Sequence, residues 1–562
     1  MNRLHNRPLY KNNKQVQTKV HFFLDYFLFV NNRIGKDDLF TVETPLYIFE
    51  NILIQLEENE IERVPKYFDK YVSNSLIANY TFSTGKENIA ELNSLVTYYN
   101  NGLQKKEKWL KDNKNTLINL VEDIVEELKE GMFKEYIRGI RRFLYCNHTL
   151  NEHFENIKLA AQLIVSDFLL NGFAKEDIEE YFKREDIYKA LFNPSPKKEE
   201  FAGLLDFRFK PVKTANFLFK LNGITLEKDE QTTIDNIFIY SCLSEKFQNL
   251  YIDIDEQKQL FLGDEPVDAN KFAIIGVEKN YRGIEHSKKQ AILQLKHVVK
   301  NINAFTDYRC TLDEESFILT PDFDKYSRQS GVQNEKYRKE GFSGLLYDYG
   351  DSLAVKELRK FDYLYEYARI DNDIDKYWQY LESLYKSISL FSKSIPDNLI
   401  KCTSNILLHE HQNYQYSWVK HYIFFCLLNN KTILGYTYDE VKTIFDKGLN
   451  NFDIGEVKKR VTNPFILDLI SIIESPKSQD DYKEVYTYYK NTLLELYEYR
   501  NHYAHAGKKV ENIRIKMERV MPMLISKFRM TICEEADRHP KKSLAKIIES
   551  LAGTAKTKFN IS

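Results

Sequence analysis

The sequence predicts a mainly α-helical protein, with a helical N-terminal region, a central α+β module and an all-helical C-terminal bundle. Three observations predict this layout. Apolar residues recur at three- and four-residue spacing along most of the chain, as in amphipathic helices. In the central module they give way to short runs of β-branched and aromatic residues, which favour strands. Prolines and lysines at 193–198 and a polar loop at 326–352 mark the edges of that module.

The chain has 562 residues, too many for one hydrophobic core, so we expect several domains. The helical N-terminal region covers 1–200, with its clearest helices at 118–128 and 154–170. The central module covers 201–325 and should hold an antiparallel sheet. Its expected elements are strands at 216–221, 234–242, 250–254, 259–262 and 272–277, then a helix at 285–303.

The C-terminal domain at 353–562 should contain helices only. Its expected helices are 363–391, 418–428, 438–449, 482–499 and 513–536. Pro522 lies inside the last of these and should kink or divide it, because proline removes a backbone hydrogen bond.

Composition limits the classes of function. The net charge of -2 excludes the global basic field of a protein that coats nucleic acid, so a nucleic-acid site must be local. We see no secretory signal and no apolar run long enough to span a bilayer, and we expect no membrane partner. The six cysteines form no C-x-x-C pair and indicate reduced thiols. These features favour a cytoplasmic location.

One motif carries the functional prediction. The helix expected over 482–499 runs directly into Arg500 and Asn501, and His505 and Gly507 follow. This arrangement resembles the R-x4-6-H motif of the HEPN superfamily, in which asparagine often follows the arginine and a glycine lies near the histidine. The resemblance implies an all-helical domain and an endoribonuclease, in which the 2′-hydroxyl attacks the phosphate and leaves a 2′,3′-cyclic phosphate and a 5′-hydroxyl.

The bare R-x4-6-H pattern is weak, because a second copy occurs in the same chain. Arg142 and His148 satisfy it, and Arg141 satisfies it at the longer spacing. That copy has neither the asparagine nor the glycine, and a surface arginine pair on a helix is the simpler interpretation. The specific part of the C-terminal match is therefore Asn501 beside Arg500, with Gly507 after His505.

The chemistry of these side chains fits RNA cleavage. Arg500 presents a fork of donors that can hold a phosphate and stabilise its developing charge. His505 can exchange protons near neutral pH, and Asn501, four residues before it, can orient it. No metal or other cofactor is needed. DNA lacks the 2′-hydroxyl and should not be cut.

Helix geometry adds a partner to the prediction. On an unbroken helix Arg500 and His505 would point about 140° apart. The helix must therefore break before Gly507, or a second copy of the motif must approach. HEPN proteins commonly pair two domains across one cleft, so the resemblance implies a homodimer or an assembly of dimers.

Residues around the motif are weaker candidates for RNA contacts. They are His502, Tyr503, Lys508 and Lys509. Each has a plainer interpretation: a filler position of the motif, a helix-packing tyrosine, or a lysine turn on the surface. Elsewhere, His409 and His411 point to different sides of a helix and fit a zinc site poorly. We find no nucleotide-binding or hydrolase motif.

The layout is similar to ApeA-like HEPN proteins, which implies anti-phage defence by abortive infection with RNA, tRNA among others, as the substrate. The central module could sense a trigger or serve as a scaffold. Partners implied are the RNA substrate and an activator or neutralising protein. Two alternatives stay open: a non-catalytic HEPN module that binds RNA or protein, and the toxin of a toxin–antitoxin pair.

Overall fold

The computed structural model describes most, but not all, of the chain. The described ranges, apart from single positions within them, are 14–33, 44–57, 63–68, 86–101, 106–146, 149–183, 212–226, 231–241, 272–306, 309–320, 352–388, 395–411, 453–475, 478–506 and 511–559, with isolated positions between 419 and 443.

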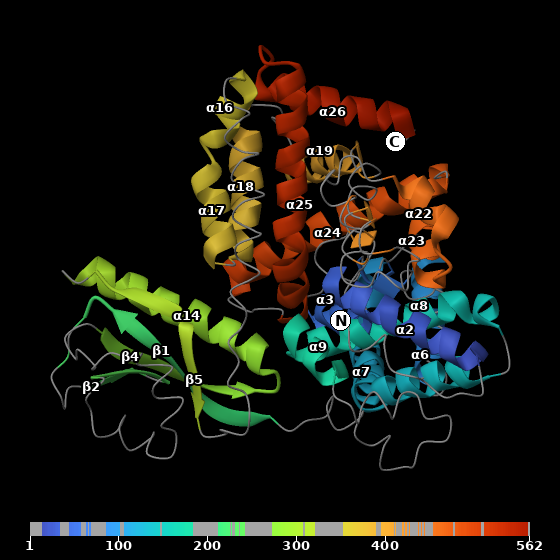
Figure 1. Ribbon diagram of the computed structural model, residues 1–562, viewed down its shortest axis with the longest axis horizontal. Helices are drawn as coiled ribbons and strands as arrows, with labels where there is room; N and C mark the ends of the chain where they lie inside the picture. The colour runs from blue at the N-terminus through green and yellow to red at the C-terminus, as the bar shows by residue number, and fades with distance from the viewer. Residues whose placement is uncertain are drawn as a thin grey trace. The chain divides into compact units, whose positions relative to one another are not determined.

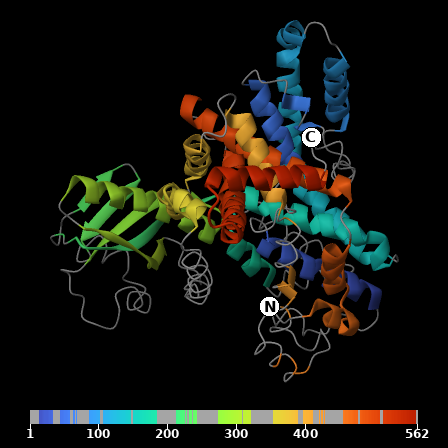
Figure 2. The same ribbon diagram turned by 90° about the horizontal axis from the view of Figure 1, so that it is seen from above.

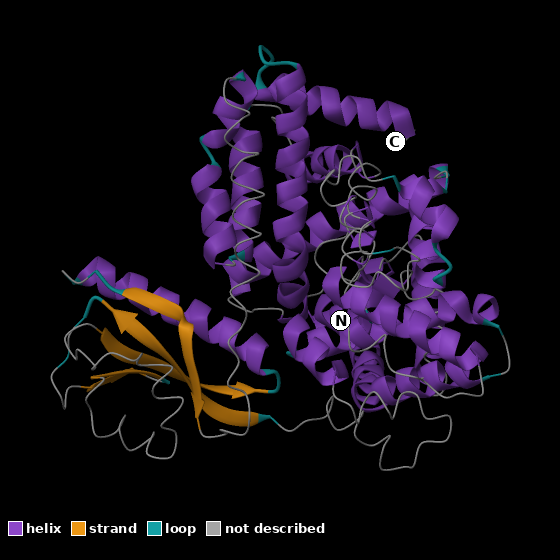
Figure 3. Ribbon diagram, in the orientation of Figure 1, coloured by secondary structure: helices purple, strands orange, loops and turns teal. Residues whose placement is uncertain are grey.

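The chain divides into two compact units. Residues 1–170, 179–208 and 351–562 form one, which we call the helical unit. Residues 171–178 and 209–350 form the other, the sheet unit. The expected fold class, mainly α with a central α+β module, is confirmed (Figure 3). Helices expected as an N-terminal region and as a C-terminal domain belong to the same compact unit. Among the described helices, none is long and apolar enough to cross a membrane.

The helical unit combines elements from both ends of the chain (Figure 1). Its described N-terminal helices are α2 (Lys14–Arg33), α3 (Pro45–Glu57), α6 (Lys86–Asn101), α7 (Lys106–Tyr145) and α8 (Leu150–Leu170), and α9 (Lys175–Lys183) begins in the sheet unit. Its described C-terminal helices are α16 (Leu353–Arg359), α17 (Asp362–Asp371), α18 (Ile374–Ser387), α19 (Ile395–His409), α22 (Ile454–Arg460), α23 (Pro464–Glu474), α24 (Gln479–Ala506), α25 (Glu511–Arg538) and α26 (Leu544–Phe559).

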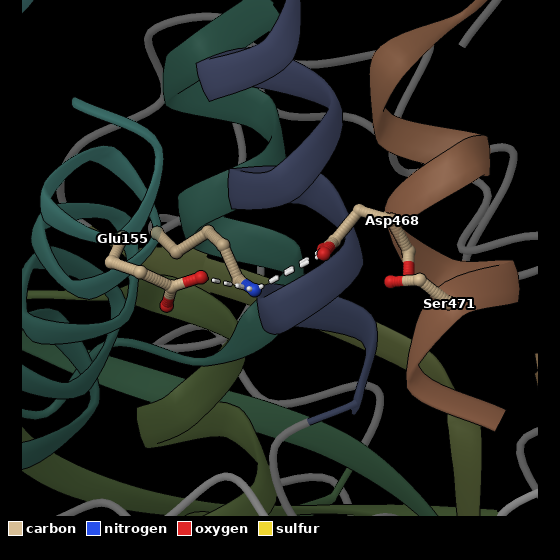
Figure 4. A network of polar contacts seen from close by, with 4 residues as sticks. Glu155, Asp468 and Ser471 are labelled. Carbon is tan, nitrogen blue, oxygen red and sulfur yellow. Dashed lines mark hydrogen bonds and ion pairs between the residues drawn. The ribbon is translucent and has the colours of Figure 1, made fainter. Parts of the chain in front are cut away.

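Contacts between distant segments hold the helical unit together. Phe29 of α2 packs edge-on against Phe465 of α23, with ring centroids 5.5 Å apart. Lys158 of α8 bridges Glu155 on its own helix and Asp468 on α23, with 3.3 Å between the Lys158 nitrogen and a carboxylate oxygen of each (Figure 4). The two ends of the sequence therefore share one interior.

The sheet unit is an antiparallel sheet with one covering helix. Its described strands are β1 (Lys213–Asn222), β2 (Gln231–Ile234), β3 (Ile237–Ser241), β4 (Phe272–Tyr281) and β5 (Thr311–Thr320), in the order β2-β3-β4-β1-β5. Phe219 of β1 pairs with Ile275 of β4. α14 (Ile284–Phe305) lies along one face (Figures 1 and 2) and buries Ala291, Leu295 and Val299 against it.

Several expected elements differ from those observed. The helix expected over 363–391 is two helices, because Asp373 caps the start of α18 by accepting a hydrogen bond from the backbone of Asp375. Pro522 does not divide α25, which is assigned continuously over Glu511–Arg538. The strand expected over 234–242 contains β3 and only the last residue of β2, and β5 lies outside the expected runs. The expected segments 250–254, 259–262, 326–351 and most of 418–428 and 438–449 lie outside the described residues.

Candidate functional site

The motif lies on α24, whose start is fixed by local hydrogen bonds. The hydroxyl of Ser478 accepts a bond from the backbone of Asp481 (3.1 Å), and the Asp481 carboxylate accepts one from the backbone of Ser478 (2.6 Å). This reciprocal capping box satisfies backbone groups that the first turn leaves without partners. α24 then continues to Ala506, so it includes the whole run from Arg500 to His505.

The continuity of α24 removes one of the two geometries that could bring Arg500 and His505 together. The helix does not break between them, so their Cα–Cβ directions differ by about 140° and their positions by roughly 7.5 Å along the axis. The two positions therefore lie on different faces of one helix.

The structure describes the predicted site residues to different extents. It gives the side chains of Arg500 and Asn501. It gives His502, Tyr503 and His505 as helical backbone positions on α24. Lys508 and Lys509 lie outside the described residues.

Arg500 is partly exposed and is oriented by its neighbour. Its Nη1 donates to Oδ1 of Asn501 at 3.1 Å, so this Asn501 oxygen is already engaged. The amide nitrogen of Asn501 remains a donor of the kind that a neutral histidine ring nitrogen accepts. Asn501 can therefore orient both an arginine and a histidine, one through each end of its amide.

On the Arg500 side of α24, the first turn of α18 approaches. Trp378 of α18 packs on Tyr497, with ring centroids 4.9 Å apart. Burial raises the pKa of the Asp375 carboxyl, and the nearby charge of Asp373 raises it further, whereas the positive charge of Arg500 lowers it. Arg500 is therefore within electrostatic reach of an acidic helix start, which competes with a phosphate for its charge.

The opposite side of α24 carries two buried carboxylates that the motif did not predict. Glu495 and Glu498 are 0% and 1% exposed. Glu495 accepts hydrogen bonds from Lys516 and Tyr47, and Glu498 pairs with Arg63 and accepts from Tyr67. One signal was visible in the sequence: Glu495, Glu498, His502 and His505 are spaced three, four and three residues apart, which places them on one helix face.

The other candidates separate from this site. Arg142 is exposed in the last turn of α7, and its partner His148 lies outside the described residues. His411 is buried, and its Nδ1 lies 2.9 Å from the hydroxyl of Tyr489, which accepts a bond from Lys527 at 2.5 Å. No group of three or more His, Cys, Asp and Glu side chains suited to a metal occurs in the described part of the chain.

Comparison of the chain with protein-family models, with curated proteins and with solved structures finds no match. The functional assignment therefore depends on the motif, its position on α24 and the side chains around it.

Proposed function

We propose that the protein is an endoribonuclease that cuts RNA at a HEPN-type site made of Arg500, Asn501 and His505. Arg500 binds the scissile phosphate and stabilises its charge in the transition state. His505 transfers protons to or from the 2′-hydroxyl and the leaving 5′-oxygen. The reaction needs no metal ion, because Arg500 stabilises the developing charge and His505 transfers the protons.

The observation that carries the proposal is the exposure of Arg500 and the orientation of its side chain. Arg500 is partly exposed near the C-terminal end of a long helix, its guanidinium donates to Asn501, and the acidic start of α18 lies within electrostatic reach of it without a described ion pair. An arginine held in this way can bind an incoming phosphate with little reorganisation. A buried arginine such as Arg529, which pairs with Asp362 at 2.6 Å, has no such capacity.

The direct test is cleavage of labelled tRNA and mRNA by the purified full-length chain in the presence of a metal chelator. We expect products with a 2′,3′-cyclic phosphate and a 5′-hydroxyl, and no cleavage where a 2′-deoxynucleotide replaces the nucleotide at the cut. Arg500→Ala and His505→Ala should each lower the rate by about 100-fold to 10,000-fold.

Matched controls exist on the same unit. Arg538 and His539 are 62% and 44% exposed at the end of α25, outside the motif. Arg538→Ala and His539→Ala should leave cleavage unchanged. Cleavage that survives both Arg500→Ala and His505→Ala would exclude this site. A folded wild-type chain that binds RNA without cutting it would favour the non-catalytic module, which the divergent directions of Arg500 and His505 within one chain also fit.

We further propose that two chains form the active site together, because α24 does not bring Arg500 and His505 to one face. Mixing the two inactive variants tests this. If Arg500 of one chain acts with His505 of its partner, random pairing of Arg500→Ala with His505→Ala chains should restore roughly a quarter of wild-type activity. No recovery in verified mixed dimers would contradict a shared site.

The cellular role that we propose is anti-phage defence by abortive infection in the cytoplasm, in which cleavage of host RNA arrests growth. End mapping of cellular RNA after induced expression, with and without phage, identifies the substrate and the trigger together. Growth arrest that needs no phage, and that a co-expressed neighbouring gene relieves, would instead indicate a toxin with a neutralising partner.

A further inference from the structure

The N-terminal part of the chain reaches the site helix through an ion pair. Nη1 of Arg63 lies 3.1 Å from Oε1 of Glu498, and the hydroxyl of Tyr67 donates to Oε2 of the same carboxylate at 3.3 Å. Glu498 is 1% exposed and Tyr67 is fully buried. The two carboxylate oxygens of Glu498 are thus each contacted from residues 63–67.

A second contact of the same kind occurs one turn earlier on α24. Oε2 of Glu495 accepts from the hydroxyl of Tyr47 at 3.3 Å and from Nζ of Lys516 at 2.6 Å. Nζ of Lys516 also lies over the Tyr47 ring, 5.4 Å from its centroid. Tyr47 belongs to α3 and Lys516 to α25, so this carboxylate joins three helices.

The position of Glu498 relates these contacts to the proposed site. Asn501 follows Glu498 by three residues and His505 follows it by seven, so all three lie toward one side of α24, whereas Arg500 lies on the other. Seven residues are two turns of helix. The contact from residues 63–67 is therefore on the His505 side of the helix, within two turns of that residue.

The contact of Glu498 with Arg63 and Tyr67 should resist rotation of α24, because a buried carboxylate is costly without its partners. A buried carboxylate keeps its charge only when cations or donors face it, and removal of one partner is strongly destabilising. Because Glu498 contacts Arg63 and Tyr67 at 3.1 and 3.3 Å, rotation or fraying of the last turns of α24 would separate it from both. Apolar packing alone resists such rotation less, since it is non-directional.

We propose that Arg63 and Glu498 are positioning residues of the ribonuclease site, and that the N-terminal part of the chain fixes the rotation of the α24 segment that carries Asn501 and His505. This inference rests on the proposed function. Arg63 acts through Glu498 and does not itself contact the substrate. The N-terminal region is then a working part of the nuclease rather than a separate accessory domain.

Kinetics and hydrogen exchange of the full chain test the inference together. Arg63→Ala and Glu498→Gln should each lower kcat about 10-fold to 100-fold, with KM within about threefold, because the substrate-binding Arg500 is unaffected. The double variant should be no worse than either single one. Arg63→Lys should retain most of the rate. Amide exchange at residues 499–506 should rise at least roughly tenfold in Arg63→Ala and stay unchanged at residues 480–488.

Arg138→Ala is the matched control. Arg138 is also an arginine of the N-terminal region, 74% exposed, and it pairs with Glu135 of its own helix at 2.7 Å. It should change neither readout. A wild type that cleaves RNA, with kcat unchanged in Arg63→Ala, would overturn the positioning role and leave the proposed function standing. If the wild type cleaves no RNA, the proposed function fails, and unchanged exchange at 499–506 would separately overturn the contact as a determinant of that segment.

Discussion

The two units of the molecule fill their interiors in different ways. The core between the sheet and α14 is apolar, with Phe219, Ile275 and Leu295 among its buried residues. The interior around α24 and α25 instead holds charged side chains at 5% exposure or less. They are Glu495, Glu498, Lys516, Lys527 and Arg529.

The difference indicates which unit is stabilised only when its side chains adopt one particular arrangement. An apolar core stabilises any close packing of the right volume, whereas buried charges stabilise only the arrangement in which their partners meet. The helical unit carries the proposed site, and its buried ion pairs contact the helix that bears this site. Its stability should therefore depend on the pairing of buried charges, whereas that of the sheet unit should depend on packed volume and on Asp177, whose pKa burial raises to about 6.

The largest expected effect comes from removing one buried charge. Lys516→Met leaves Glu495 buried without its cation and should lower the free energy of unfolding of the helical unit by about 3 to 5 kcal/mol. Urea unfolding followed by tryptophan fluorescence measures this unit alone, because all three tryptophans, Trp109, Trp378 and Trp418, belong to it.

A second substitution distinguishes lost pairing from lost packing. Lys516→Met combined with Glu495→Gln removes both charges and should recover more than half of the loss. If the double variant loses as much stability as the two single variants together, the two positions act independently, and the buried pair does not act as a unit.

In the sheet unit the matching experiment is Leu295→Ala. Leu295 is fully buried between α14 and the sheet, so the cavity should lower the stability of this unit by about 2 to 4 kcal/mol. Amide exchange in β1 and β4 measures it. Leu295→Met, which nearly conserves volume, should cost under about 1.5 kcal/mol. A cost as large as that of alanine would mean that this core also demands an exact arrangement.

Asp25 makes the pH dependence of the helical unit testable. Burial raises the pKa of this carboxyl to about 7, and a hydrogen bond from Asn463 opposes the shift. The folded state therefore holds the proton more tightly than the unfolded state. Its contribution to stability is fully present below about pH 4 and is lost as the pH rises through 7, by about 2 to 4 kcal/mol.

The measurement is the difference in urea stability between wild type and Asp25→Asn across pH 4 to 8. The variant should gain on the wild type steadily as the pH rises. Asp480→Asn, at an 87% exposed carboxylate on α24, should show no comparable trend. A flat difference for Asp25→Asn would mean that this carboxyl titrates normally.

The smallest effect is expected at the surface. On α7, Arg138 is 74% exposed and pairs with the partly buried Glu135, and Arg138→Ala should change the stability of the helical unit by less than about 0.5 kcal/mol. A loss comparable with that of Lys516→Met would show that burial does not separate the two classes of ion pair. The same fluorescence measurement decides it.

The fold was predictable where a pattern is local and regular. The helix expected at 285–303 is α14 at Ile284–Phe305, because its apolar stripe needs only the sheet beneath it. β5 was missed because Asp313, Glu314 and Glu315 interrupt its apolar pattern. Among the described strands it lies at the edge of the sheet, next to β1, and an edge strand tolerates charge.

The candidate site was predictable only along one helix. The motif indicated that Arg500, Asn501 and His505 follow a helix, and helical spacing left two possibilities open, a break in the helix before Gly507 or a second copy of the motif; α24 continues through His505. The partners of that helix could not be predicted, because Tyr67 and Glu498 are 431 residues apart in sequence and no local pattern links them. A pairing of this kind follows from tertiary packing, which no local pattern encodes.

That separation has a consequence for synthesis of the protein. At roughly 5 to 20 residues per second, a ribosome needs roughly 20 to 90 seconds to travel from Tyr67 to Glu498. Throughout that interval the emerging N-terminal helices lack the carboxylates of Glu495 and Glu498 that they finally contact. The sheet unit is synthesised before these carboxylates. A chain released early would carry neither a finished helical interior nor Arg500, so under the proposed function it should not cut the messenger RNA from which it is made.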